Sequence, residues 1–159
     1  HYTADEYYEL AVKLRNTFKN CTLTTDIMVG FPTETEKDFE ETVAFAEKVG
    51  FEKIHIFPYS VRTGTRAALM KPQIEKHVKE ERAAALAVTA EKLRSEFLRS
   101  QIGKTVSIIP ETHGKDGFVF GYTENYTPVM AKVSKDTIGK TVFVKITDSD
   151  KDYCYAEAV

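Results

Sequence analysis

A stretch of 28 residues without glycine or proline, residues 73–100, most constrains how this chain of 159 residues folds. Its apolar residues recur at roughly helical spacing, and alanines add helix propensity. This stripe consists of Ile74, Val78, Leu86, Ala90, Leu93 and Phe97. The pattern predicts one long helix that divides the chain, so we expect three segments: residues 1–70, a linking helix over 71–100, and residues 101–159.

The first segment has the pattern helix, strand, helix, strand. Thr3 and Glu6 have the spacing of a capping box, which predicts a helix start, and apolar residues follow at helical spacing. Strands are predicted over Leu23–Phe31 and Lys53–Tyr59, joined by a helix that ends at Gly50. A strand, a crossover helix and a strand with short connections make a βαβ unit with parallel strands.

Two parallel strands do not make a domain, because a parallel sheet needs more strands and helices on both faces. The first segment therefore resembles the end of a larger α/β domain, and its sheet edge is expected to be open to pairing with another copy. Asp26 and His55 fall within the two strands and are expected to be buried there.

The third segment is rich in short strands separated by turn residues. Strands are predicted over Thr105–Glu111, Phe118–Tyr122, Thr127–Val133, Thr141–Ile146 and Tyr153–Ala158. Five strands in so short a stretch indicate a small closed barrel with an OB-like architecture. The expected fold class is α+β.

Charge and cysteine content exclude several classes of protein. The net charge of −2 combines −5 over residues 1–61, +4 over 62–100 and −1 over 101–159, so bulk charge indicates neither a nucleic acid nor a membrane partner. No run of about 18 apolar residues occurs, so we expect no membrane-spanning helix. Cys21 and Cys154 are too far apart for a metal motif, and two reduced thiols in a cytoplasmic protein are the favoured interpretation.

Polar residues follow both strands of the βαβ unit. Gly30 ends the first strand, and Tyr59, Ser60 and Arg62 end the second. Ligands of α/β proteins bind at the carboxyl ends of parallel strands, where a glycine lets them approach the backbone. The alternative is a tight turn in which a buried Asp26 satisfies loop amides.

Lysines and aromatic residues alternate in the third segment. Lys104, Lys115 and Lys132 occur in the same region as Tyr122 and Tyr126. This combination fits nucleic-acid binding by stacking and phosphate contact. The alternatives are core aromatics with solvated lysines and, for the arginines of the long helix, a solvated helix face.

Three motifs together resemble the radical SAM methylthiotransferases. They are Thr25-Asp-Ile-Met-Val-Gly-Phe-Pro-Thr-Glu-Thr35, His55-Ile-Phe-Pro-Tyr-Ser-Val-Arg-Thr-Gly-Thr-Arg-Ala-Ala68 and Gly121-Tyr-Thr-Glu-Asn-Tyr-Thr-Pro-Val129. The third is similar to the TRAM domain of the tRNA-modifying branch, and most of all to the subgroup acting on threonylcarbamoyladenosine. Thr33 stands where the family usually has glycine.

The resemblance implies the C-terminal part of a radical SAM partial barrel followed by a TRAM barrel. It implies S-adenosylmethionine and two [4Fe–4S] clusters as cofactors, tRNA as partner, and further domains of the parent protein that hold the clusters. The CxxxCxxC motif has no counterpart here, so the chain alone is expected to be inactive. The alternative is a nonenzymatic RNA-binding module or an interaction adaptor.

The resemblance also assigns site residues by position. The candidate cofactor-binding residues are Asp26, Gly30, Phe31, Pro32, Glu34, Tyr59, Ser60 and Arg62. The candidate RNA-binding residues are Arg82, Arg94, Arg99, Lys104, Lys115, Tyr122, Asn125, Tyr126 and Lys132.

Overall fold

The computed structural model describes residues 2–114 and 116–159, and the chain divides into two compact units. Unit 1 comprises the residues up to Lys19 together with Leu23–Leu93. Unit 2 comprises Asn20–Thr22 and Arg94–Val159. The boundary falls inside the long helix, so this helix is shared between the units and is not a separate segment. Lys115 lies outside the described residues.

The helices of unit 1 begin and end at residues with defined capping roles. Helix α1 (Ala4–Thr17) starts at Thr3 with the predicted capping box, in which Glu6 accepts from the Thr3 backbone. Helix α2 (Glu36–Val49) starts at Thr35 with a second capping box, formed with Asp38. It ends at Gly50 in the left-handed conformation, as predicted.

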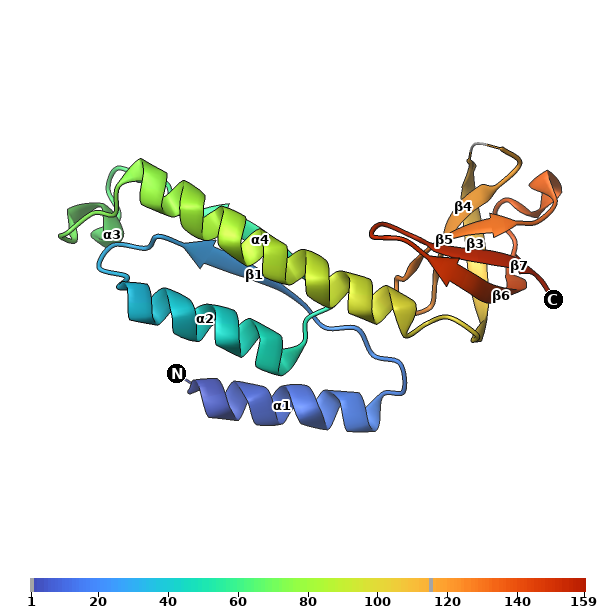
Figure 1. Cartoon of the computed structure of the whole chain (residues 1–159), viewed down its shortest axis with the longest axis horizontal. Coiled ribbons are helices and arrows are strands. Elements are labelled where there is room, and N and C mark those ends of the chain that lie inside the picture. The colour runs from blue at the N-terminus through green and yellow to red at the C-terminus, as the bar shows by residue number, and fades with distance from the viewer. Residues whose placement is uncertain (1, 115) are drawn as a thin grey trace. The chain divides into compact units, whose positions relative to one another are not determined.

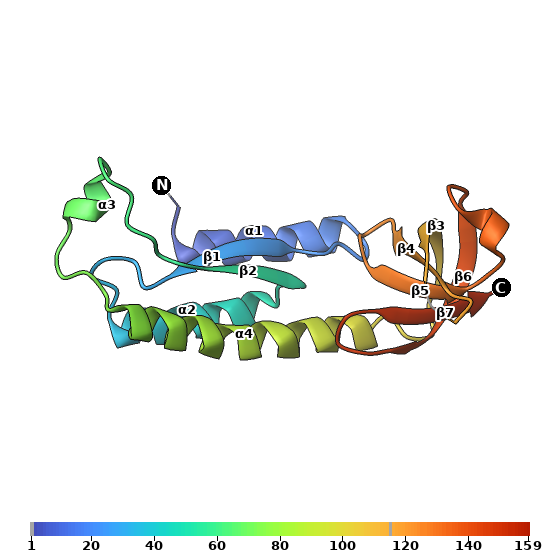
Figure 2. The ribbon, with the colours of Figure 1, turned by 90° about the horizontal axis from the view of Figure 1, so that it is seen from above.

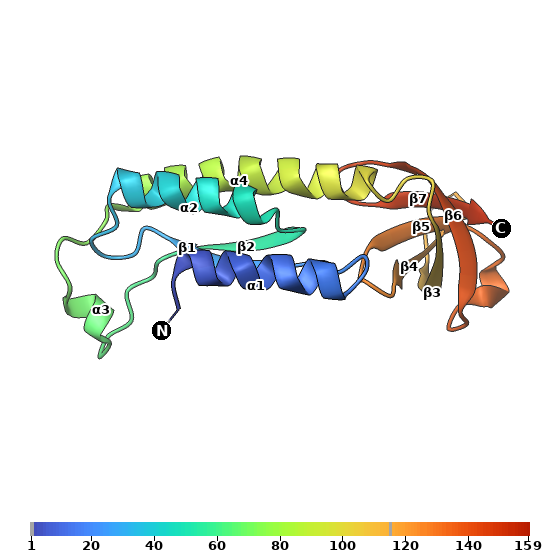
Figure 3. The same ribbon diagram turned by 90° about the horizontal axis from the view of Figure 1, so that it is seen from below.

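Strands β1 (Thr24–Val29) and β2 (Lys53–Pro58) pair in parallel, which confirms the βαβ unit. A short helix, α3 (Arg66–Leu69), follows β2. Helix α2 lies between α1 and α4 (Figure 1), and α2 and α4 lie on the same side of the two strands (Figure 2). Figure 3 shows α1 from below, where it runs alongside the strands.

The two faces of the sheet differ sharply in burial. Ile27, Val29 and Ile54 turn toward the helices and pack in the unit 1 core with Phe39 of α2. On the other face, Asp26 and His55 are paired in register and both are exposed. The expectation that these two residues are buried is therefore wrong, because alternate strand residues point to opposite faces and only one face carries helices.

Helix α4 (Lys76–Arg99) confirms the predicted long helix, although it begins three residues later than the glycine-free and proline-free stretch. It contributes Leu86 to the core of unit 1 and Leu98 to the core of unit 2. No helix among the described residues is long and apolar enough to cross a membrane.

Unit 2 is a closed five-stranded barrel, as predicted. Its strands are β3 (Thr105–His113), β4 (Val119–Thr123), β5 (Pro128–Lys132), β6 (Val142–Ser149) and β7 (Cys154–Ala158), with a 3₁₀ turn at Lys135–Thr137. Around the barrel the order is β3-β4-β5-β7-β6, and β5 pairs with β7 in parallel. Inward-facing aliphatic residues such as Ile108, Val129 and Val144 fill its interior. The fold class is α+β.

Gly121 and Cys154 show how tightly the barrel is packed. A Cβ at Gly121 would lie 2.3 Å from the carbonyl oxygen of Ile109, so β3 and β4 approach too closely there for any side chain. Cys154 is fully buried as a free thiol, and burial raises its pKa to about 11. Cys21 is also a free thiol but is only half-buried.

Candidate functional site

The carboxyl ends of β1 and β2 lie side by side and bring the two predicted cofactor-binding segments together. The Tyr59 backbone N–H donates to the carbonyl of Val29 at 2.8 Å. The rings of Phe31 and Tyr59 meet edge to face, with centroids 5.4 Å apart. The segments after β1 and β2 are therefore neighbours in unit 1.

The Glu34 side chain bonds to the backbone of the turn after β1. Its Oε2 accepts from the Gly30 backbone N–H at 2.7 Å and from Nη1 of Arg82 at 2.6 Å. The second guanidinium nitrogen of Arg82 donates to Glu36 at 3.0 Å. Arg82 is only 6% exposed, so it belongs to a buried ion-pair cluster. The prediction that Arg82 binds RNA on the helix surface is wrong for this reason.

The electrostatics of this cluster favour the charged form of Arg82. Burial of the guanidinium opposes its charge, but the carboxylates of Glu36 and Glu34 outweigh that cost and raise the pKa of Arg82 above its ordinary value. The Nε atom of Arg82 is buried without a hydrogen-bond partner. The ion pairs of Arg82 with Glu34 and Glu36 therefore hold α4 against the turn.

Lys79 is a residue of this site that sequence reasoning missed. Its ammonium donates to the Tyr59 carbonyl at 3.1 Å and lies 5.3 Å from the centre of the Tyr59 ring. Its Cγ would lie 2.3 Å from a Cβ placed on Gly30, so the lysine fills the space beside that glycine. No local signal marks Lys79, because it stands on a helix far along the chain from both strands.

The groups left available at the strand ends are fewer than the resemblance implied. The Gly30 N–H and the Glu34 carboxylate bond each other, and Pro32 is fully buried. Asp26, Ser60 and Arg62 are exposed, and the Tyr59 hydroxyl is buried without a partner. A polar cofactor at this edge would therefore be held by the exposed side chains and not by the turn backbone at Gly30.

Thr33 adopts a left-handed conformation, with φ of 74°. Its backbone N–H donates to the Pro72 carbonyl at 3.1 Å, which ties the turn to the segment before α4. A β-branched residue in this conformation is a backbone outlier. The turn thus keeps a threonine at position 33 at the cost of a strained Thr33 backbone.

The described residues offer no site for an iron–sulfur cluster. They contain no group of three or more His, Cys, Asp or Glu side chains placed to hold a metal ion. Cluster ligation needs several thiolates together, and each cysteine of this chain lacks such neighbours.

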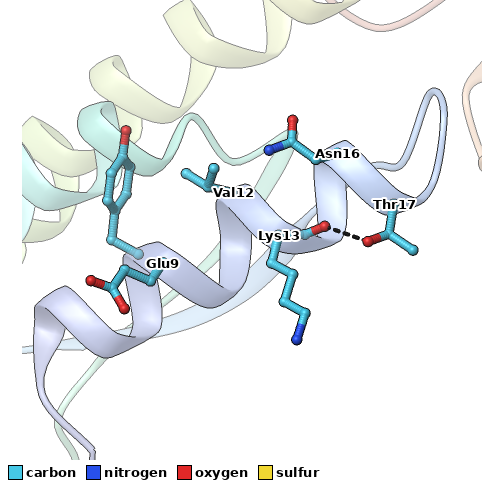
Figure 4. Close-up of a pocket in the computed structure, with 6 residues that line it drawn as sticks. Glu9, Val12, Lys13, Asn16 and Thr17 are labelled. Carbon is cyan, nitrogen blue, oxygen red and sulfur yellow. Dashed lines mark hydrogen bonds between the residues drawn. The ribbon is translucent and has the colours of Figure 1, made fainter.

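Two pockets of unit 1 lie away from the strand ends. One, of about 460 Å³, runs along the outer face of α1 and is lined by Tyr8, Glu9, Val12, Lys13, Asn16 and Thr17 (Figure 4). The Thr17 hydroxyl bonds back to the Lys13 carbonyl, at 2.8 Å. The other, of about 400 Å³, lies between the start of α1 and α2, and Tyr7, Phe45 and Phe51 contribute to its lining. Neither pocket gathers the predicted site residues.

A row of aromatic rings marks the surface of unit 2. Tyr126, Tyr122, Phe120 and Tyr153 follow one another with centroid distances of 6.1, 5.0 and 5.7 Å. We call these four residues the aromatic row. Tyr122 and Tyr126 are among the predicted RNA-binding residues, whereas Tyr153, which the turn after β6 brings beside Phe120, is not. In the sequence, Asp150 and Asp152 indicate a turn directly before Tyr153.

The predicted basic residues of unit 2 occupy different environments. Arg94 donates to the Asp152 carbonyl at 3.2 Å, next to Tyr153. Lys104 is half-buried and donates to the Asn20 side chain at 3.2 Å. Arg99 and Lys132 are exposed. Lys115 cannot be placed among them, because it lies outside the described residues.

Comparison with known proteins finds a family match for unit 2. Residues 99–159 match the family model of the TRAM domain. The chain is 39% identical to threonylcarbamoyladenosine tRNA methylthiotransferase MtaB of Bacillus subtilis over 96% of its length. Over almost its whole length, the chain is therefore similar to a part of the tRNA methylthiotransferases.

Other relatives extend this match. The tRNA-2-methylthio-N(6)-dimethylallyladenosine synthases of Oceanobacillus iheyensis and Campylobacter jejuni are 43% and 37% identical over 93% and 99% of this chain. The matches cover 35%, 29% and 36% of the three relatives, so the chain spans about a third of their length. A solved protein of Methanococcus maripaludis matches 36% of the chain and 79% of its own, with 24% identity and a TM-score of 0.32, too low to argue from.

Proposed function

We propose that this chain belongs to an enzyme that adds a methylthio group to threonylcarbamoyladenosine beside the anticodon of tRNA, and that unit 2 binds the tRNA. The observation that carries the proposal is the extent of the match, which covers 96% of the chain and so includes the βαβ unit as well as the TRAM region. A nonenzymatic RNA-binding module would share only the barrel with these relatives.

The choice of threonylcarbamoyladenosine rests on the resemblance of the three motifs, and one relative's name agrees with it. Relatives named for dimethylallyladenosine match about as well, so identity alone does not select the substrate. Nucleoside mass spectrometry of tRNA from a deletion strain tests the choice. We expect the methylthio derivative of threonylcarbamoyladenosine to disappear and that of dimethylallyladenosine to persist; the reverse result would reassign the substrate.

We further propose that S-adenosylmethionine and two [4Fe–4S] clusters serve the whole enzyme, acting in the cytoplasm, and that the cluster ligands come from parts of the protein other than these residues. The absence of a metal-binding group among the described residues supports this division. The chain alone, after reconstitution with iron and sulfide, is expected to hold no cluster and to leave S-adenosylmethionine intact. Cluster uptake with cofactor cleavage would contradict the proposal.

A further inference from the structure

We propose that Tyr126 stacks on an unpaired RNA base and that Asn125 is the residue that positions it. This inference rests on the proposed RNA binding of unit 2 and names the residue that makes the contact. Tyr126 is 79% exposed, and its backbone is in the left-handed region with φ of 59°. Both facts concern a single turn between β4 and β5.

The conformation of Tyr126 is costly for the fold. A bulky aromatic residue at positive φ is a genuine outlier, since such positions suit glycine or asparagine. The side chain gains little from burial, because most of its ring faces water. Strained residues of this kind concentrate at functional sites, where the surrounding structure over-determines them. A tyrosine at this position therefore does not stabilise the fold, whereas it could contact a ligand.

The surrounding turn is built to hold that conformation. Asn125 Oδ1 accepts from the hydroxyls of Thr123 and Thr127, and the Thr127 backbone N–H donates to Thr123 Oγ1 at 3.0 Å. The Tyr126 N–H itself donates to the Thr123 carbonyl at 3.0 Å. A preorganised ring loses little conformational entropy when it binds.

Asn125 also anchors the turn to a second part of unit 2. Its Nδ2 donates to the Asn20 carbonyl at 2.9 Å, and its own carbonyl accepts from the Thr22 hydroxyl at 3.0 Å. The side-chain amide oxygen of Asn125 therefore accepts two hydrogen bonds, and its nitrogen donates one, all within unit 2. Asn125 acts through Tyr126 as a positioning residue and is not itself the RNA contact that the motif suggested.

The aromatic row provides further rings in line with Tyr126. Tyr122 and Phe120 continue from it along β4, and Tyr153 completes the row with 37% of its surface exposed. The exposed rings of Tyr126 and Tyr153 can stack on a base of any sequence, because every base has a flat π-face. The row fits a short single-stranded segment better than a duplex, whose bases are already stacked.

Basic side chains adjoin both ends of the row. Lys104 is linked to the Tyr126 turn through Asn20, and Arg94 is linked to the Tyr153 turn through the Asp152 carbonyl. Positively charged side chains in these positions can neutralise the phosphates beside the stacked bases. Glu124, which shares the Tyr126 turn, accepts from the Ser107 hydroxyl at 2.9 Å. Asp150 accepts from the backbone N–H groups of Asp152 and Tyr153.

The test measures binding of this chain to unmodified tRNA and to a short single-stranded RNA that carries the fluorescent base 2-aminopurine. We expect Tyr126→Ala to weaken binding about 5- to 150-fold, the range that loss of one base–aromatic stack produces. Fluorescence quenching on binding should disappear with it. Tyr126→Phe keeps the ring and should bind within about twofold of the native chain.

Tyr126→Gly separates stacking from folding. Glycine accepts the left-handed conformation, so the melting temperature should rise by a few degrees while binding falls as in Tyr126→Ala. Loss of binding together with lowered stability would contradict the proposal, since the effect would then come from damage to the fold. Phe143→Ala removes a matched ring that is 65% exposed on β6, outside the row, and should leave binding unchanged.

Asn125→Ala should weaken binding although the Tyr126 ring is still present. Where this variant lowers the melting temperature too far, Thr22→Val removes only the bond to the Asn125 carbonyl and tests the same point. Equal binding by the native chain and Tyr126→Ala would overturn the inference and leave RNA binding by unit 2 intact. A native chain that binds neither RNA would instead refute the proposed RNA binding itself.

Discussion

The two candidate sites use their polar and aromatic side chains in opposite ways. At the strand ends of unit 1, Glu34, Arg82 and the Gly30 amide bond one another and are withdrawn from solvent. On unit 2, a strained turn holds Tyr126 out into water. The first arrangement stabilises a connection between a turn and a helix, whereas the second gives up stability to present a ring. The buried ion pair therefore indicates a structural role, whereas an exposed ring on a strained turn points to binding.

The largest expected effect tests whether the unit 1 cluster is structural. Glu34→Gln removes the buried carboxylate and leaves Arg82 paired only with the largely exposed Glu36. Breaking a buried ion pair from one side costs about 3–5 kcal/mol. Hydrogen exchange should show lost protection in α2 and the adjoining part of α4, with the barrel strands unchanged.

RNA binding by the Glu34→Gln variant should remain close to native at temperatures where unit 1 is still folded. Glu41→Gln is the matched control, because it removes an exposed carboxylate paired with Lys37 on the same helix region. A strong loss of RNA binding with intact protection would mean that the cluster takes part in recognition.

The second effect tests the close packing of β3 against β4, the strand that carries Phe120 and Tyr122 of the aromatic row. Gly121→Ala places a Cβ 2.3 Å from the Ile109 carbonyl oxygen, where only backbone can move. We expect a loss of about 2–4 kcal/mol in the free energy of unfolding of the barrel, measured by urea denaturation. Gly139→Ala is a useful comparison, since no atom lies near its Cβ and only its φ of 76° opposes the substitution. Equal costs at both positions would show that β3 and β4 can separate.

The third effect concerns the interior of unit 2, where Cys154 is the buried titratable side chain. Its thiol pKa rises from the ordinary value of 9.0 to about 11, mainly through burial. The folded chain therefore keeps a proton that the unfolded chain loses first, so the contribution of this thiol to stability is constant below about pH 9 and is lost as the pH rises to about 11. The expected loss is about 2–3 kcal/mol.

Unfolding measured across that pH range should lose this component in Cys154→Ala. Cys21→Ala, which removes the half-buried thiol, should retain it. If both variants follow the native pH profile, other titrating groups are responsible and the Cys154 thiol is accessible to water.

The smallest effect sharpens the comparison within the unit 1 cluster. Glu36 bonds the same guanidinium as Glu34, but its side chain is 70% exposed. Glu36→Gln should therefore cost less than about 1 kcal/mol, because solvent screens an exposed ion pair. Thermal unfolding of the two glutamine variants side by side measures the difference. A cost equal to that of Glu34→Gln would show that charge, and not burial, sets the strength of the pair.

Local patterns determined much of this molecule from the sequence. The capping box at Thr3 and Glu6, the helix end at Gly50 and the five short strands depend on neighbours within a few residues, so their positions could be predicted closely. The family resemblance likewise followed from three short motifs. The pairing of the two strand ends was predictable because a parallel βαβ unit allows only one arrangement.

Only the tertiary structure decided which of these side chains are free to act. Arg82 and Arg94 stand on one helix and were assigned the same role, yet Arg82 is buried against Glu34 whereas Arg94 lies beside the turn of Tyr153. Asp26 proved exposed because helices cover only one sheet face. Burial, long-range pairing and the closure of the barrel join residues far apart in the chain, and no local pattern carries that information.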